Sequence, residues 1–320
     1  MSGESDLIMT AAHLDLQQQM LQAHAAGLTW RAVGTQSRMQ SFVPPTKAGD
    51  VLLSTAELQQ IHWIDAEDRT CEVDAGLSPA TLHAALDEYG LMLGHSGCND
   101  DVGTIGGLLN SGAPSLLAGS CGLPRDQVLG ATWLLGDGRV IRSGARVVKS
   151  VAGYDVSRLL LSAQGQLAVG LRFILRLRPR PSDLRWYVLP TALQRPPASW
   201  RPRADFQQDG RRFAAWEGCD SPLPLAQSIS SHEGDTAWKL ARQQCIVAKH
   251  WVATPGPWQA QEMQAAGLSM QQCLIFDHLA HQSAWPQLAE DISLPAGSAV
   301  LPHRQASPWL AAMRQALLRS

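Results

Sequence analysis

The sequence lacks any uninterrupted hydrophobic run of the roughly 18 or more residues that a membrane-spanning helix needs. Its most apolar stretch, residues 159–177, is broken by Arg172 and Arg176. The N-terminus is acidic and then Gln-rich, and it lacks the apolar segment of a secretory signal. These absences predict a cytoplasmic protein without a membrane span. Any contact with the inner membrane would be peripheral and made through partner proteins.

The chain also lacks dense basic tracts and paired cysteines. It has 26 Lys and Arg against 28 Asp and Glu, so nucleic acid is not an expected partner. The six cysteines are scattered and form no C-x-x-C pair, which argues against a zinc cage or a disulfide framework. His278 and His281 are three residues apart, without i,i+4 spacing or a further ligand cluster. We therefore predict no metal site.

What is present is an α/β pattern in the first half of the chain. Short apolar runs near residues 51–53, 61–64 and 70–73 are bounded by turn residues, which favours strands. Ser78 and Pro79 predict the start of a helix that ends at Gly90. Asp137-Gly138 between apolar runs predicts a hairpin. Further predicted elements are helices over residues 6–26 and 156–162 and a strand over residues 167–177.

A proline-rich segment divides the chain. Six prolines lie within residues 179–202, where they interrupt regular structure. We place a domain boundary there, giving domains over residues 1–180 and 181–320. The second part holds eight of the 11 tryptophans, for which core positions are favoured over an aromatic substrate site.

Nine of the 27 glycines lie from Gly90 to Gly122. Within this region, residues 103–112 read Gly-Thr-Ile-Gly-Gly-Leu-Leu-Asn-Ser-Gly. Paired glycines let the main chain approach a ligand, and successive amides pointing one way form an anion-binding nest. We predict such a nest at Thr104–Gly107, holding a diphosphate. The structural alternative is that Thr104 caps a helix.

Two motifs follow this loop in order. Residues 119–130 read Gly-Ser-Cys-Gly-Leu-Pro-Arg-Asp-Gln-Val-Leu-Gly, and residues 149–155 read Lys-Ser-Val-Ala-Gly-Tyr-Asp. Together with Val73–Leu77, they resemble the FAD-binding domain of the vanillyl-alcohol-oxidase superfamily, the PCMH-type fold. Within that family they are most similar to FAD-binding subunits of bacterial glycolate oxidases. No G-x-G-x-x-G opens a helix here as a Rossmann fingerprint requires.

This resemblance implies an FAD-binding fold of mixed α/β and α+β character. FAD would extend between two subdomains, and a smaller C-terminal α+β cap domain would cover the isoalloxazine. The pyrophosphate and ribityl chain would lie at Thr104–Gly107, and Asn110 and Gly112 would approach the flavin. The cofactor-binding residues that it implies are Gly34, Thr35, Gly103, Thr104, Ile105, Gly106, Gly107, Asn110, Gly112, Arg125, Gly153 and Tyr154.

The resemblance also implies partners: a larger flavoprotein subunit, an iron–sulfur subunit and a small 2-hydroxy acid substrate. No Arg/His constellation suited to gripping a carboxylate and taking a proton is evident, so catalytic residues are unassigned. His95 is either a base near the flavin or a solvated loop residue. Arg125 and Asp126 either orient phosphate or the partner surface, or form a local ion pair. We expect an accessory or electron-transferring subunit of an FAD-dependent oxidoreductase.

One departure from the family motivates an alternative. Family members carry a Gly-Gly-Gly-Thr-type loop after the first strand, whereas this chain has Arg31-Ala32-Val33-Gly34-Thr35-Gln36. A scaffold subunit that keeps the fold without flavin is therefore a second hypothesis. A self-contained flavin oxidoreductase with its own substrate site in the Trp-rich half is a third.

Overall fold

The computed structural model describes most of the chain up to residue 247 and short segments beyond it. The described residues are 9–37, 49–94, 103–111, 117–122, 124–144, 156–190, 202–221, 223, 225–247, 250–253, 275–277, 282–285 and 299–301.

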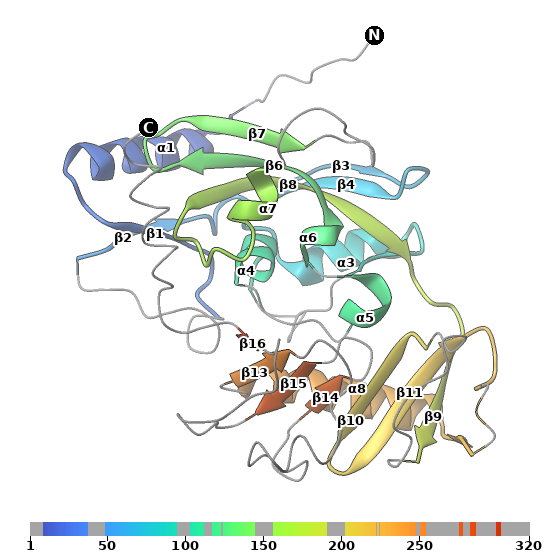
Figure 1. The fold of residues 1–320 in the computed structure, drawn as a ribbon. Coiled ribbons are helices and arrows are strands. Elements are labelled where there is room, and N and C mark those ends of the chain that lie inside the picture. The colour runs from blue at the N-terminus through green and yellow to red at the C-terminus, as the bar shows by residue number, and fades with distance from the viewer. Residues whose placement is uncertain are drawn as a thin grey trace.

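The first part of the chain is built on a six-stranded sheet (Figure 1). The strands along it follow the order β3-β4-β8-β6-β7, and β5 pairs with the end of β8. All of these pairs are antiparallel. The strands are β3 (Ile61–Asp65), β4 (Thr70–Asp74), β5 (Leu91–Leu93), β6 (Val128–Leu135), β7 (Val140–Gly144) and β8 (Ala168–Pro179). A separate parallel pair is formed by β1 (Trp30–Val33) and β2 (Val51–Ser54).

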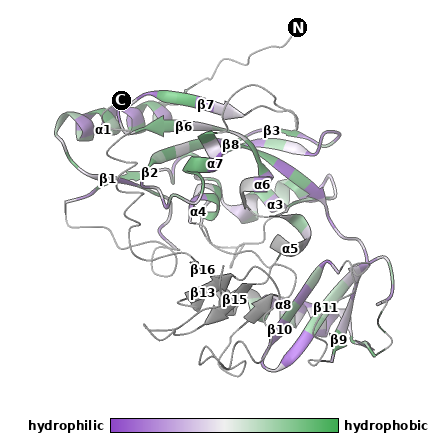
Figure 2. Cartoon of the chain, in the orientation of Figure 1, coloured by the Kyte–Doolittle hydropathy of each residue, from purple (hydrophilic) through white to green (hydrophobic). Residues whose placement is uncertain are grey.

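Helices cover both faces of this sheet (Figure 1). One face carries α1 (Ala11–Ala25) beside β1 and β2. The other carries α3 (Pro79–Asp87), α4 (Ile105–Asn110), α5 (Ala118–Cys121), α6 (Pro124–Gln127) and α7 (Val156–Leu160). Hydrophobic residues follow β6 and β8 through the middle of the sheet, where both faces are covered (Figure 2). This arrangement explains why β8 is apolar along most of its length.

A bulge in β8 changes which of its residues face each hydrophobic core. Its pairing with β6 shifts between Thr132 and Trp133, so that Leu171 is skipped in the register. Val169 and Leu171 therefore join the core beneath α1, while Phe173 and the following alternate residues join the core beneath α3 and α4. The extra residue reverses the alternation of side chains, so that Leu171 and Phe173, two residues apart, point to opposite faces of the sheet.

The predicted elements of this part are confirmed. Ser78 Oγ accepts the Thr81 N–H at 3.0 Å and caps α3, with Pro79 at the first helical position. Gly90 has a φ of 61°, which suits the end of a helix. The hairpin at Asp137-Gly138 joins β6 to β7, and Gly138 has a φ of 86°. Helix α1 begins later than the predicted start at residue 6, although residues 1–8 lie outside the described residues.

A second sheet begins at β9, a few residues after β8 ends. It has eight strands in the order β12-β9-β11-β10-β14-β15-β13-β16. Their bounds are β9 (Leu184–Leu189), β10 (Ala204–Gln208), β11 (Arg211–Glu217), β12 (Gln227–Ser228), β13 (His250–Ala253), β14 (Ile275–Asp277), β15 (Gln282–Trp285) and β16 (Ala299–Leu301). The division into domains at residue 180 stays a prediction.

Helix α8 (Ser231–Val247) packs on this second sheet. Trp186 lies between them, against Trp238 and directly over Gly234, where a Cβ would come within 2.0 Å of the indole. Trp186 and Trp216 are both buried, as predicted for core positions. Asp205 and Arg212 form a fully buried ion pair between β10 and β11, with two hydrogen bonds of 2.9 and 2.7 Å.

Candidate functional site

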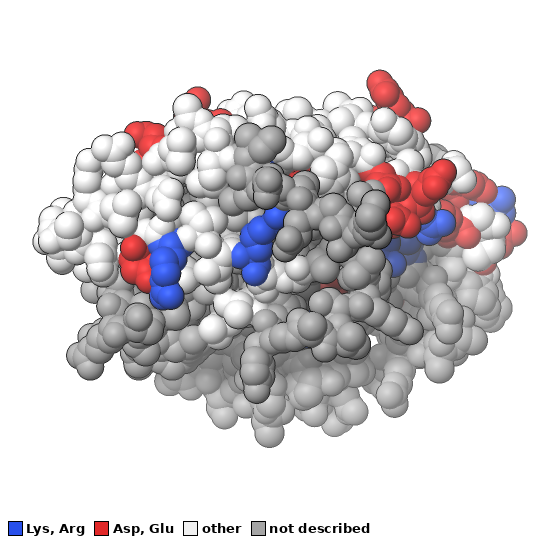
Figure 3. Space-filling model, turned by 90° about the horizontal axis from the view of Figure 1, so that it is seen from above, with Lys and Arg blue, Asp and Glu red and all other residues white. Residues whose placement is uncertain are grey.

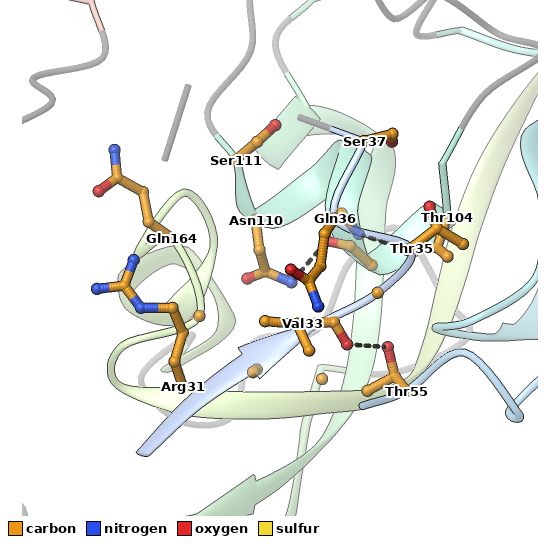
Figure 4. A pocket seen from close by; sticks show the side chains of 16 residues that line it. Arg31, Val33, Thr35, Gln36, Ser37, Thr55, Thr104, Asn110, Ser111 and Gln164 are labelled. Atoms are coloured by element: carbon orange, nitrogen blue, oxygen red, sulfur yellow. Dashed lines mark hydrogen bonds between the residues drawn. The ribbon is translucent and has the colours of Figure 1, made fainter. Parts of the chain in front are cut away.

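A cleft of about 620 Å³, part of it open to solvent, lies between β1 and α4 (Figure 4). One wall is the end of β1 with the loop that follows it, Arg31–Ser37. The facing wall is α4 with its flanking residues Thr104 and Ser111. Thr55, the turn at Gln164-Gly165 and Gly170 complete the lining.

The Thr104–Gly107 segment forms one wall, but its amides do not form the predicted nest. The Ile105 N–H donates to the Leu77 carbonyl at 2.8 Å, and the Gly106 N–H donates to the Ala75 carbonyl at 2.7 Å. The Gly107 N–H donates to Thr104 Oγ1 at 3.0 Å. The prediction that these amides converge on a diphosphate is wrong for Ile105, Gly106 and Gly107, because main-chain and capping partners already satisfy their N–H groups. The structural alternative, Thr104 as a helix cap, is confirmed.

The two adjacent glycines of α4 have different surroundings. A Cβ at Gly106 would lie 3.0 Å from both the Cβ and the carbonyl oxygen of Ala75, so a side chain there would press α4 away from the end of β4. A Cβ at Gly107 would meet only Thr104 Oγ1, at 3.1 Å, and otherwise enter the cleft. The absence of a side chain therefore allows close packing at Gly106 and leaves space in the cleft at Gly107.

Unused main-chain donors lie on the opposite wall. Within the described part of the chain, the N–H groups of Gly34, Thr35 and Gln36 have no hydrogen-bond acceptor. Gln36 has a φ of 59°, in the left-handed region of backbone conformation that residues other than Gly and Asn rarely adopt. Successive amides around such a residue can form an anion-binding concavity. Sequence analysis identified Gly34 and Thr35 but missed Gln36, since no residue type there signals a positive φ.

Asn110 supplies a side-chain acceptor at the cleft. Its Nδ2 donates to the Gly106 carbonyl at 3.0 Å, while its Oδ1 is buried and has no hydrogen-bond donor in the described structure. Figure 4 shows Asn110 from α4 and Gln36 from the facing loop reaching toward the same space. A buried acceptor without a donor costs free energy, which a ligand N–H or O–H would recover.

Arg31 is the one ionisable side chain among the described residues that line the cleft. It is largely buried, and this burial lowers the pKa of its guanidinium, against the opposing charge of Asp50. Figure 4 shows its guanidinium on the same side of the cleft as Gln164. The cleft thus offers main-chain N–H groups, amide side chains and one cation. These groups suit the binding of a polar anionic ligand, whereas proton transfer needs a side chain that can act as acid or base.

The remaining predicted residues are placed as follows. Gly103, with a φ of 98°, precedes Thr104 outside the cleft lining. Ile105 is fully buried in the core, so neither its side chain nor its amide faces the cleft. Arg125 belongs to α6, but its side chain is not among those described. His95, Gly112, Lys149, Gly153, Tyr154, His278 and His281 lie outside the described residues.

The described residues show neither a metal centre nor a membrane-spanning helix. They contain no group of three or more His, Cys, Asp or Glu that could bind a metal. Among the described residues on the face shown in Figure 3, charged side chains are few except at one end, where acidic ones gather beside some basic ones. None of the described helices combines the length and the apolar character that a membrane crossing requires.

Comparison with known proteins identifies relatives of the first part of the chain. Residues 7–144 match a family model described as "FAD binding domain". The chain is 34% identical over 137 residues to glycolate oxidase subunit GlcD of Bacillus subtilis (strain 168), covering 43% of this chain and 29% of that protein. It is 32% identical over 155 residues to glycolate oxidase subunit GlcE of Escherichia coli (strain K12), covering 47% and 39%. The aligned regions thus span well under half of these relatives.

The fold is also similar to that of a solved protein. A structure of alkyldihydroxyacetonephosphate synthase superposes with a TM-score of 0.62 at 12% sequence identity, covering 96% of this chain and 69% of the other. At this level of identity the similarity concerns the fold alone. It supports the arrangement of strands and helices around the cleft.

Proposed function

Because this chain carries an FAD-binding domain of the PCMH type, with the vanillyl-alcohol-oxidase fold and FAD as its cofactor, we propose that the cleft between β1 and α4 holds that FAD. The diphosphate lies against the amides of Gly34–Gln36, and not against Thr104–Gly107 as the sequence motif suggested. The observation that supports this is the set of unused amides around a left-handed Gln36, facing a wall that includes Gly107.

The residues of the cleft fit such a cofactor. The Gly34–Gln36 amides provide donors for phosphate oxygens, and Arg31 contributes a nearby positive charge. Asn110 Oδ1 provides an acceptor for a ribityl hydroxyl or a flavin N–H. A side chain at Gly107 would occupy space that the cofactor needs. Gly103, Gly112, Arg125, Gly153 and Tyr154 remain proposed contacts on the resemblance alone.

The protein residues bind and orient the cofactor, while FAD, when bound, supplies the capacity to accept and pass on electrons. Arg31 is ionisable but stays protonated, so the described lining offers no side chain that can take a proton from a hydroxy acid. We therefore assign this chain an accessory or electron-transferring role in an FAD-dependent oxidoreductase that acts on the CH–OH group of a small 2-hydroxy acid. The names of the GlcD and GlcE relatives support glycolate as the substrate class.

The word "subunit" in both relatives' names supports a multi-subunit assembly. We propose a larger flavoprotein subunit and an iron–sulfur subunit as partners. In this assembly, residues 181–320 form the cap-like domain over the flavin, and the protein works in the cytoplasm, at the inner membrane only through its partners.

The test is to purify the full chain, record its visible spectrum and identify the compound released on denaturation by mass spectrometry. We expect an oxidised-flavin spectrum and about one FAD per chain. A matched pair of variants, Asn110→Leu and Gln59→Leu, compares the orphan acceptor in the cleft with an exposed amide elsewhere. We expect only Asn110→Leu to weaken FAD retention, and equal retention in both would exclude Asn110 as a contact.

The two alternatives give different results. A scaffold subunit, motivated by the altered Arg31–Gln36 loop, would purify colourless and would not take up added FAD. A self-contained oxidoreductase would oxidise a hydroxy acid with an artificial electron acceptor when alone. The proposed role requires bound FAD, no turnover by the isolated chain, and turnover after the partner subunits are added.

A further inference from the structure

A buried cluster of ionisable side chains lies on the α1 side of the sheet. Asp74, the last residue of β4, is nearly inaccessible to solvent. Its Oδ1 lies 2.7 Å from His62 Nε2 on β3 and 3.3 Å from Arg172 Nε on β8. His13 of α1 points its Nε2 at the same oxygen from 3.6 Å, just beyond hydrogen-bond distance. Asp74 Oδ2 accepts the main-chain N–H of Gln60 at 3.1 Å. One carboxylate thus connects α1, β3, β4 and β8.

The charges of this cluster are balanced only while the histidines are neutral. Asp74 and Arg172 carry opposite charges. Burial opposes ionisation of Asp74, but hydrogen bonds from His62 and the Gln60 N–H hold the pKa of its carboxyl below its usual value. The next acidic residue on this face of β4, Glu72, accepts Trp63 Nε1 at 3.1 Å and lies 3.9 Å from Arg142 of β7. A proton added to His13, whose side chain is fully buried, therefore adds a buried positive charge.

His13 is held in one neutral form by the start of α1. The main-chain N–H of Thr10 donates to His13 Nδ1 at 3.2 Å, and Thr10 Oγ1 lies 2.7 Å from the same nitrogen. Nδ1 is therefore an acceptor, and the ring proton is on Nε2, facing Asp74. A second proton, on Nδ1, would oppose the Thr10 N–H and place a cation in the first turn of a helix. Burial lowers the pKa of His13, with Arg172 and His62 acting in the same direction and Asp74 opposing them.

His13 shares its face of α1 with the residues that support the cofactor cleft. The buried face of this helix is His13, Leu16, Met20 and Ala23. Leu16 and Met20 pack in one core with Trp30 of β1 and Leu53 of β2. Strand β1 runs directly into the Gly34–Ser37 loop at the cleft. The position of α1 is thus coupled, through this shared core and through β1, to the loop that faces the proposed diphosphate.

We propose that His13 is an acid-sensitive latch, whose protonation releases α1 from the six-stranded sheet and from the β1–β2 pair that shares its core, and thereby loosens the Gly34–Ser37 wall of the cleft. The effect on cofactor retention rests on the proposed function, whereas the release of α1 does not. If His13 can take its proton only when α1 is undocked, with an ordinary histidine pKa near 6.5, the docking constant falls by about 11-fold at pH 5.5.

The latch is tested by hydrogen exchange of the full chain at pH 7.5 and 5.5, with rates corrected for the intrinsic pH dependence. We expect protection of residues 11–25 to fall about tenfold at pH 5.5, relative to the β6 strand as an internal reference. In His13→Gln this loss should disappear, because Gln can keep the capping contact to Thr10 without titrating. His24→Gln, on the exposed side of the same helix, is the matched control and should behave like the unchanged protein.

The outcomes separate the latch from the flavin assignment. Loss of α1 protection that persists in His13→Gln, or no loss in the unchanged protein, overturns the latch whether or not FAD is present. For the link to the cleft, FAD retained after ultrafiltration is measured at both pH values. We expect acid to lower retention in the unchanged protein and not in His13→Gln. Release of α1 with unchanged retention would overturn that link, and a chain without FAD at either pH would refute the proposed function alone.

Discussion

A methyl group added at each of the two adjacent glycines of α4 tests a different property. At Gly106 it tests the packing of the helix, and at Gly107 it tests the space that a ligand needs. At Gly106, an added Cβ would press on the Cβ and the carbonyl oxygen of Ala75, both at 3.0 Å. At Gly107, it would meet the Thr104 hydroxyl oxygen at 3.1 Å and otherwise enter the cleft. We therefore expect Gly106→Ala to lower stability and Gly107→Ala to lower FAD retention.

The magnitudes follow from two opposing contributions. Alanine in place of glycine favours a helix by about 1 kcal/mol. Overpacking against a fixed backbone costs about 1–3 kcal/mol, so Gly106→Ala should lose up to ~2 kcal/mol, or up to roughly 8 °C in melting temperature. For Gly107→Ala, the helix preference offsets the milder contact with Thr104, and the melting temperature of the FAD-free protein should change by less than about 2 °C.

The assay measures thermal unfolding of the FAD-free proteins and the dissociation constant for FAD by fluorescence. We expect at least a tenfold weaker affinity for Gly107→Ala, a loss of about 1.4 kcal/mol, since the methyl group lies where the cofactor should be. For Gly106→Ala, affinity should change less than stability. Stoichiometric FAD with unchanged affinity in Gly107→Ala would refute the placement of the cofactor in this cleft.

Two further predictions concern stability and reactivity. Asp205→Asn should destabilise the second sheet by about 3–5 kcal/mol in a denaturant titration, because Arg212 stays fully buried without its charged partner. The double variant with Asp205→Leu and Arg212→Met should recover much of this lost stability. If Asp205→Asn alone were as stable as the unchanged protein, the argument would be contradicted. Burial raises the pKa of the Cys71 thiol to about 12, so it should resist alkylation at pH 8 until the protein unfolds. Exposed Cys219 should react at once, which mass spectrometry of the labelled peptides would show.

The sequence alone determined much of the local structure. Ser78-Pro79 placed the start of α3, and Asp137-Gly138 placed the β6–β7 hairpin, because capping and turn geometry depend on a few neighbouring residues. The FAD-binding motifs also located the correct part of the chain, since residues 7–144 match that family. Local signals were sufficient wherever the physical cause lies within a few residues.

Which wall of the cleft offers free amides was decided only by the tertiary structure. The Gly106 amide is used because the Ala75 carbonyl, 31 residues earlier, comes within 2.7 Å when α4 packs on β4. The cluster around Asp74 likewise brings together His13, His62 and Arg172 from three distant segments. Whether a donor is satisfied, or a carboxylate is paired, depends on partners that are remote in sequence, and only packing of the folded chain brings them into contact.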